Sequence, residues 1–256
     1  MDNDSLKVEP LKGIKKFHTR QSPNGHLPEL PFRLVAVAGS GSGKSLTIQN
    51  MILKKSLYRD CWDYIILMGP TVRIDPQWQP VIDHMQKDLG RDTDSKTRPC
   101  ILETFDNDAL VRLLGDHEKL VKKLKSRKTN DSVELPAALF IFEDLADDPA
   151  AMRRSAILSM YVRMRHINCS CALLVQKYKL LSPIVRVNAT VLLVWKLRNE
   201  TESDQVCEDL SGRYGFKRTL EIYRLCTEEQ YSFLMCDALR DTFFKRFELE
   251  VKVGGR

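Results

Sequence analysis

The chain has 256 residues, which suits one α/β domain with an ample hydrophobic core. Its 40 Lys and Arg outnumber 34 Asp and Glu, and the formal net charge of +6 fits an acidic partner such as nucleic acid without requiring one. No apolar run is long enough for a membrane span, and the first thirty residues lack the apolar centre of a signal peptide, so we expect a soluble intracellular protein. The seven cysteines form no C-x-x-C pair, which favours buried free thiols.

Residues 1 to about 30 are polar and basic, and several prolines interrupt them. This composition predicts a flexible basic N-terminal arm or a peripheral strap. The remainder, residues 31–256, is expected to form a single domain.

The strongest motif, RLVAVAGSGSGKSLTIQNMI, spans residues 33–52. An apolar run at 34–38 predicts a buried strand, and an amphipathic helix follows from Lys44. Between them lies a turn that ends in the P-loop pattern G-x-x-x-x-G-K-[ST], with Ala38 in place of the first glycine. The nucleotide-binding residues predicted from this pattern are Gly39, Ser40, Gly41, Ser42, Gly43, Lys44 and Ser45.

The chemistry of such a loop is specific. Glycines let backbone N–H groups surround phosphate oxygens, and the following helix adds the positive end of its dipole. Lys44 is expected to reach the β- and γ-phosphates, and the Ser45 hydroxyl to ligate Mg²⁺. The sequence therefore predicts a site for a nucleoside triphosphate with Mg²⁺.

The next segments predict a strand at 63–71, a short helix at 77–89 and a short strand at 100–103. A helix then begins with Asp106 or Asp108 as its N-cap and ends in a basic run, which leads into a basic loop near 116–134. The run has three open explanations: a solvated helix end that complements the dipole, a DNA phosphate contact, or a nuclear-import signal.

The second chemical motif is AALFIFEDLADD, residues 137–148, which is typical of a Walker B strand. Its acids, Glu143 and Asp144, should emerge at the carboxyl edge of a parallel sheet. One would hold Mg²⁺ through water and the other would orient or deprotonate the attacking water, and the sequence leaves open which does which. Asp147 and Asp148 are expected to cap a helix at 149–164.

Further strands are predicted at 167–176 and 189–197, followed by a helix at 200–214, with Gly215 as its C′ residue if the helix runs to its end, and then by terminal strands or a hairpin. Gln176, at the end of its strand, is a candidate γ-phosphate sensor. The segment at 169–175 supplies an additional strand between the P-loop strand and Walker B. The predicted fold is thus α/β, a P-loop NTPase three-layer sandwich with a mainly parallel sheet of the additional-strand type.

The segments ILMGPT, MRHINCSCALLVQ, IVRVNATVLL and YSFLMCD occur in order with the two nucleotide motifs. Over residues 30 to 245 the set resembles the poxvirus-type genome-packaging ATPases, which belong to the FtsK–HerA branch of P-loop motors in large DNA viruses and related mobile elements. The resemblance implies an ATPase that translocates double-stranded DNA, without reading its sequence, into a capsid at sites of virion assembly in the host cytoplasm or nucleus.

The resemblance also implies roles for particular residues. Lys44 and Ser45 take the Walker A positions, Glu143 and Asp144 the Walker B positions, and Gln176 the sensor position. The family forms a homo-oligomeric ring in which an arginine of one subunit completes its neighbour's site. Arg165 and Arg186 lie in the matching segments, with Arg163 a weaker candidate.

Two other classes of protein remain open. Glu143 stands where the family more often has aspartate, which is compatible with an assembly factor that uses ATP as a structural switch. A small-molecule kinase or another NTPase is the other alternative, whereas the absence of an N-K-x-D stretch counts against a GTPase.

Overall fold

The computed structural model describes residues 17–127, 132–144, 155–212 and 214–251. In these ranges nine strands form one sheet. From one edge to the other they are β4 (Ile101–Leu102), β3 (Tyr64–Met68), β6 (Ala138–Glu143), β7 (Cys169–Val175), β2 (Arg33–Val37), β8 (Val191–Trp195), β9 (Phe233–Asp237), β10 (Thr242–Lys245) and β11 (Leu249–Glu250). The six strands from β4 to β8 in this order are parallel to one another. Strands β9, β10 and β11 each pair antiparallel with the strand before them in this order. The mainly parallel sheet is therefore confirmed.

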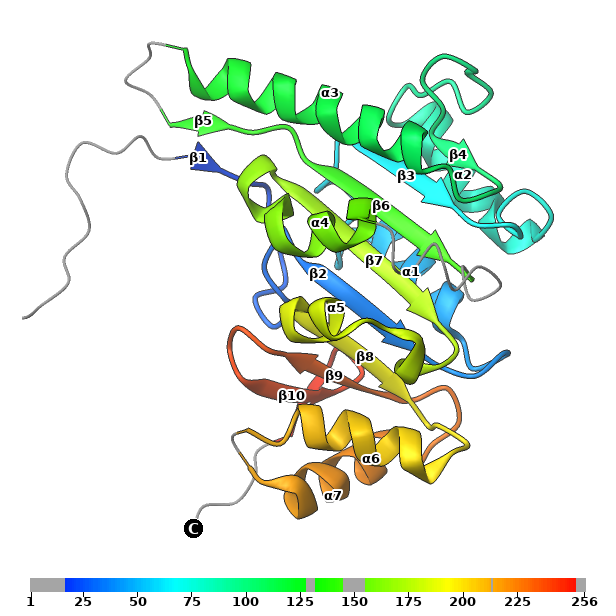
Figure 1. Ribbon diagram of the computed structural model, residues 1–256, viewed down its shortest axis with the longest axis vertical. Coiled ribbons are helices and arrows are strands. Elements are labelled where there is room, and N and C mark those ends of the chain that lie inside the picture. The colour runs from blue at the N-terminus through cyan, green and yellow to red at the C-terminus, as the bar shows by residue number, and fades with distance from the viewer. Residues whose placement is uncertain (1–16, 128–131, 145–154, 213, 252–256) are drawn as a thin grey trace, which may run out of the picture.

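Strand β7 lies between β2 and β6 and is parallel to both, with Val37 opposite Val175 and Phe142 opposite Leu173. The predicted additional strand is therefore present. All residues of β6 and β7 are buried, as a strand covered on both faces requires. Figure 1 shows that β2, β6 and β7 point the same way, so the residues after them meet at one edge of the sheet.

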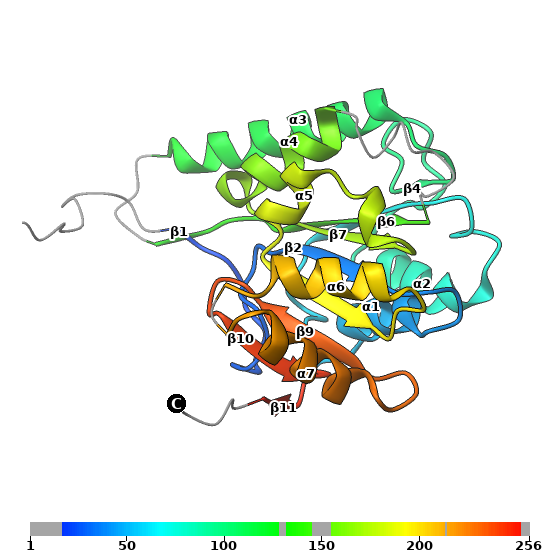
Figure 2. The same cartoon turned by 60° about the horizontal axis from the view of Figure 1, so that its bottom comes forward.

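Helices cover both faces of the sheet and make the predicted three layers (Figures 1 and 2). One face carries α1 (Lys44–Leu53) and α2 (Gln79–Lys87), and the other carries α3 (Asn107–Lys125), α4 (Ser155–Arg163) and α5 (Pro183–Asn188). Helices α6 (Glu200–Asp209) and α7 (Phe216–Thr227) pack against each other, and α7 contacts β9 and β10. The 3₁₀ helices are η1 (Pro76–Trp78), η4 (Met164–Ile167) and η5 (Tyr178–Leu180).

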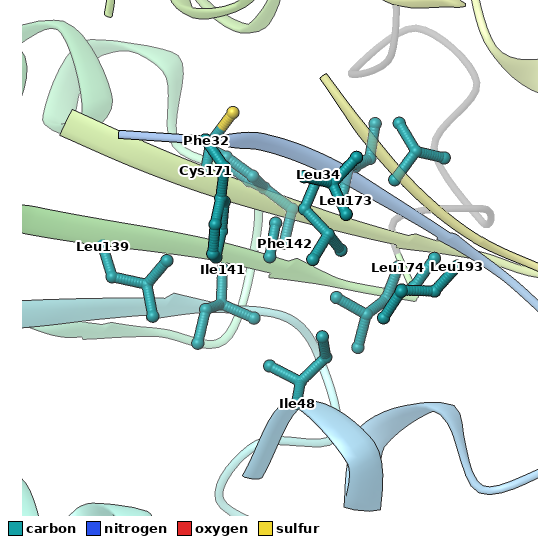
Figure 3. Close-up of a cluster of buried hydrophobic side chains, with 14 of the residues drawn as sticks. Phe32, Leu34, Ile48, Leu139, Ile141, Phe142, Cys171, Leu173, Leu174 and Leu193 are labelled. Carbon is teal, nitrogen blue, oxygen red and sulfur yellow. The ribbon is translucent and has the colours of Figure 1, made fainter. Parts of the chain in front are cut away.

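Apolar side chains from the sheet and the P-loop helix form the core. In Figure 3, Ile48 of α1 points toward the sheet, where Ile141 and Leu174 lie. Ile48 is 2 % exposed and Leu174 is completely buried. This packing fixes α1, and hence its first residue Lys44, against the strands that carry the acids.

The N-terminal segment follows the strap alternative over the part that is described. Strand β1 (Phe17–His18) pairs in parallel with β5 (Val133–Glu134). Leu27 and Leu30 are buried in the main core, and the Gln21 side chain bonds to both backbone groups of Leu30 at 2.8 and 2.9 Å. Residues 1–16 lie outside the described ranges, so the arm predicted there remains a proposal.

Two local predictions concern helix ends. Asp106, rather than Asp108, is the N-cap of α3, because its carboxylate accepts from the backbone N–H groups of residues 108 and 109 at 3.0 and 2.9 Å. The prediction of Gly215 as a C′ residue was wrong, since α6 ends at Asp209 and Gly215 (φ 73°) instead precedes α7. Helix α7 itself was not predicted, although FKRTLEIYRLCT has helical spacing.

Two further expectations concern cysteines and membrane spans. The seven cysteines are all free and buried, as expected. Within the described residues, no helix combines the length and apolar character of a membrane span. Asp147, Asp148 and the start of the predicted helix at 149 lie outside the described residues.

Candidate functional site

The P-loop lies at the carboxyl edge of the sheet, between β2 and α1. Ala38 is fully buried and its N–H donates to the Val175 carbonyl at 3.1 Å, so this position continues the strand ladder and accepts a small side chain. Gly41 (φ 74°) and Gly43 (φ 87°) have left-handed backbones that favour glycine. All seven predicted nucleotide-binding residues, 39–45, line a cavity of about 750 Å³.

Lys44 and Gln176 meet at the Asp144 carboxylate. The Lys44 ammonium, with only 7 % of the residue exposed, lies 3.4 Å from Asp144 Oδ1. The Gln176 side-chain amide donates to the same oxygen at 3.3 Å. Asp144 follows the last residue of β6 and has a left-handed backbone (φ 45°). Lys44 and Gln176, which are far from Asp144 in the sequence, thus contact the same carboxylate oxygen of Asp144.

Glu143 has a different environment. The Ser45 hydroxyl donates to its Oε1, while Oε2 is buried and has no hydrogen-bond partner among the described residues. Burial is the main cause that raises the pKa of Glu143, and the Asp144 charge adds to it, whereas Ser45 and the Trp78 indole act in the opposite direction. The two acids are therefore not equivalent, since Glu143 faces the P-loop serine and Asp144 faces the P-loop lysine.

The pair of Ser45 and Glu143 has the chemistry that Mg²⁺ requires. A hydroxyl and a carboxylate are hard oxygen ligands, and Oε2 is a buried acceptor that forms no hydrogen bond of normal geometry among the described residues, although the Trp78 indole N–H lies beside it. Within the described ranges, no group of three or more His, Cys, Asp or Glu residues could hold a metal alone. An ion here would complete its shell with phosphate and water oxygens, as Mg²⁺ commonly does in nucleotide sites.

Two residues that support Glu143 were not predicted from the sequence. A Cβ added to Gly69 would lie 2.5 Å from the Glu143 carbonyl oxygen, so only glycine allows β3 and β6 to end this close together. The buried Trp78 of η1 lies beside the Glu143 carboxyl group. Gly69 belongs to ILMGPT, where a glycine directly after a strand was the available signal.

None of the three candidate arginines lines the P-loop cavity of its own chain in the described residues. Arg186 is paired with Asp209 at 2.9 Å and lies over the Tyr178 ring, with its guanidinium carbon 5.6 Å from the centroid. The exposed Arg165 contacts His166 at 3.3 Å, and Arg163 is exposed at the end of α4. The described part of one chain thus brings the Walker residues and Gln176 together without an arginine.

Comparison with protein families gives a match to the family described as Poxvirus A32 protein over residues 19–238. Comparison with curated proteins gives no match. The matched residues include every strand from β2 to β9 and all the predicted site residues.

Solved structures share the fold. The genome packaging NTPase B204 of Sulfolobus turreted icosahedral virus 2, in complex with AMP, is 17% identical, with 88% of this chain and 97% of that chain covered and a TM-score of 0.54. The same NTPase with ATP-gammaS is 20% identical, over 84% of this chain and 95% of that one, with a TM-score of 0.50. The pCW3 conjugation coupling protein TcpA with ATPgS is 16% identical, over 80% and 57%, with a TM-score of 0.52.

Proposed function

The chain belongs to the Poxvirus A32 protein family, and from this membership and the site geometry we propose that it is an ATP-hydrolysing motor that translocates double-stranded DNA into a capsid. The observation that carries the proposal is the convergence of Lys44, Ser45, Glu143, Asp144 and Gln176 at the P-loop. The similar protein B204 is described as a genome packaging NTPase and was solved with ATP-gammaS.

In the proposed reaction the backbone N–H groups of residues 39–45 and the Lys44 ammonium hold the β- and γ-phosphates. Ser45 and Glu143 are assigned to Mg²⁺, which neutralises phosphate charge when bound. Asp144 and Gln176 are assigned to the attacking water, because they share a hydrogen bond beside Lys44 at 3.3 and 3.4 Å. A γ-phosphate would compete for the Lys44 ammonium and leave the Asp144 carboxylate able to accept a proton from water.

A second subunit would complete the site, and two observations support this. Leu46 and Ile74 line the P-loop cavity and are 54 % and 78 % exposed, so two apolar side chains beside the nucleotide position are free for a neighbour to cover. The cavity also lacks an arginine of its own among the described residues. We assign the arginine to Arg186 or Arg165 of a neighbour in a homo-oligomeric ring, and Arg186 would have to leave Asp209 to reach it.

A surface distant from the nucleotide is suited to DNA phosphates. We define the basic patch as residues 116–127, which are the end of α3 and the two residues after it, together with residues 163–166. It holds seven Lys and Arg against two carboxylates. Lys125 Nζ donates to the His166 carbonyl at 2.7 Å, which joins the two segments. In Figure 1 the C-terminal end of α3 lies near β1 and β5, where the parallel strands begin, on the side away from the P-loop. Apart from Arg165, which is also a candidate for a neighbour's nucleotide site, this charge lies away from the nucleotide of its own chain, and we assign it to DNA phosphates.

The test is steady-state ATP hydrolysis with and without long double-stranded DNA at two salt concentrations. A motor should be stimulated by DNA, and salt should weaken the stimulation because phosphate contacts release counterions. Lys44→Ala should abolish turnover. A hydrolysis rate that DNA does not change would favour another NTPase or a kinase. ATP binding without turnover would favour the nucleotide-switched assembly factor.

The basic patch is tested separately by DNA binding. Replacing Lys119, Lys122 and Lys123 with Gln should flatten the dependence of log K on log salt by about 0.9 for each phosphate that is no longer neutralised. Matched Gln replacements of Lys217, Arg218 and Arg224, exposed on α7, should leave it unchanged. Equal effects of the two triple variants would refute the patch and leave the ATPase proposal standing.

A further inference from the structure

The carboxylate of Asp209, the last residue of α6, accepts hydrogen bonds from three side chains. Its Oδ2 accepts from the Tyr178 hydroxyl and from Arg186 Nη1, each at 2.9 Å. Its Oδ1 accepts from Gln205 Nε2 at 3.0 Å. Burial raises the pKa of Tyr178 and the Asp209 charge adds to the rise, so the hydroxyl keeps its proton and remains a donor. One carboxylate oxygen thus joins η5 to the candidate arginine of α5.

Arg186 uses only part of its guanidinium in this contact. Its Nη1 pairs with Asp209, whereas its Nε is buried and has no hydrogen-bond partner among the described residues. An arginine pairs most strongly with a carboxylate through two parallel N–H donors. The contact is therefore weaker than the strongest arginine–carboxylate pair, and a donor of Arg186 is left over for another anion.

The surface around Arg186 is open to another molecule. The Arg186 side chain is 23 % exposed, and its neighbour Val187 on α5 is 83 % exposed. Ile184, also on α5, is 45 % exposed. A neighbouring subunit that covered these two apolar side chains would lie directly beside Arg186.

The same carboxylate is connected through the chain to the predicted sensor. Gln176 lines the P-loop cavity and donates to Asp144 Oδ1 at 3.3 Å. A single residue, Lys177, separates Gln176 from Tyr178, and its backbone is extended (φ −133°, ψ 122°). Two residues of extended chain span about 7 Å. A displacement of Gln176 by a γ-phosphate thus acts on the backbone within two residues of the hydroxyl that contacts Asp209.

From this geometry we infer that Asp209 and Tyr178 form a latch that withholds Arg186 from a neighbouring subunit until a γ-phosphate engages the chain's own sensor. The inference rests on the proposed ATPase function and on the assignment of Arg186 to a neighbour's site. Asp209 and Tyr178 are positioning residues, since neither of them lines the P-loop cavity. When the sensor moves, η5 moves with it and the contact at Asp209 weakens. Arg186 then exchanges the carboxylate for the phosphate of the neighbouring nucleotide, so hydrolysis in one subunit depends on the nucleotide state of the next.

The experiment measures steady-state ATP hydrolysis by the full chain over a range of ATP concentrations without DNA. Wild-type rates should rise sigmoidally, because each subunit waits for its neighbour. Asp209→Asn keeps the shape and removes the charge. It should raise turnover at low ATP roughly fivefold, which corresponds to about 1 kcal/mol for a partly exposed ion pair, and make the curve hyperbolic.

Two variants separate the latch from its surroundings. Tyr178→Phe removes only the hydroxyl and keeps the ring beside Arg186, so it should act in the same direction as Asp209→Asn and less strongly. Gln205→Ala is the matched control, because Gln205 contacts the other oxygen of Asp209, and it should change neither turnover nor the shape of the curve.

A double variant then tests whether the effect passes through the arginine. Arg186→Ala should inactivate the Asp209→Asn protein, because the latch acts only on Arg186. A gain in turnover that survives Arg186→Ala would overturn the inference. So would an Asp209→Asn protein that melts at a lower temperature with a wild-type curve, since the ion pair would then be only structural.

The remaining outcomes distinguish this inference from the proposed function. If Arg186→Ala alone keeps wild-type turnover, the latch has no arginine to release, and the inference fails while the ATPase proposal stands. If the wild-type curve is hyperbolic, the subunits do not wait for one another and the latch is refuted. If wild-type protein does not hydrolyse ATP with or without DNA, the proposed function and this inference fail together.

Discussion

Gly69 offers the sharpest test of the site geometry. The perturbation is Gly69→Ala, which adds one methyl group directly after β3. That Cβ would lie 2.5 Å from the Glu143 carbonyl oxygen and 3.1 Å from the Glu143 Cβ. Cβ atoms essentially never come within 3.0 Å of another heavy atom, so the ends of β3 and β6 must separate by about half an ångström.

The magnitude follows from overpacking a fixed backbone. Forcing one methyl group into such a site costs about 1–3 kcal/mol of unfolding free energy. For a domain of this size we expect the melting temperature to fall by roughly 2–12 °C, from about 2–4 °C per kcal/mol. Displacement of Glu143 from Ser45 should also reduce ATP turnover of the folded protein by roughly tenfold or more, since a misplacement of about 1 Å can cost 100-fold.

The assay combines denaturant unfolding with turnover per folded molecule. Gly115→Ala is the matched control, because nothing lies within 4 Å of a Cβ there and the residue sits inside α3. This variant should gain up to about 1 kcal/mol from helix propensity and keep wild-type turnover. Wild-type stability and turnover in Gly69→Ala would refute the close contact between β3 and β6.

Three further predictions concern the charged and polar residues of the site. Burial raises the pKa of Glu143, so the folded state holds this proton more tightly than the unfolded state, and stability falls as pH rises above the usual glutamate range. In thermal melts, the nucleotide-free Glu143→Gln variant should therefore be more stable than the wild type at about pH 7–8 and less dependent on pH. Its ATP turnover should fall by roughly 100-fold. Gln176→Ala should slow hydrolysis by roughly 100-fold and leave the ATP dissociation constant unchanged; a parallel loss of affinity would contradict the sensor role. If Arg186 acts in trans, Arg186→Ala should inactivate the ring. Mixing Arg186→Ala subunits with Lys44→Ala subunits should then restore part of the ATPase activity. If that mixture stays inactive and a mixture of Arg165→Ala with Lys44→Ala subunits recovers activity, the role belongs to Arg165.

The sequence was informative where one continuous segment holds all the information. The P-loop pattern spans 38–45, and an apolar run before it and an amphipathic segment after it are clear in the sequence, so the strand and the helix were placed correctly. The parallel strands are nearly continuous apolar runs because both of their faces are covered, which also predicted β7 between β2 and β6. Failures were local: the glycine at 215 was paired with the wrong helix, because a glycine with positive φ can precede a helix as well as end one.

Only the tertiary structure distinguishes residues that share a motif or that come together from distant segments. Glu143 and Asp144 are neighbours with equivalent chemistry in sequence, and only the folded chain shows that Glu143 meets Ser45 whereas Asp144, with its left-handed backbone, meets Lys44. Tyr231 reaches the P-loop because the antiparallel β9 returns beside β8, far along the chain. Sequence patterns report periodicity over a few turns or strands, whereas contacts between distant segments depend on how the whole sheet packs, and that information exists only in the folded chain.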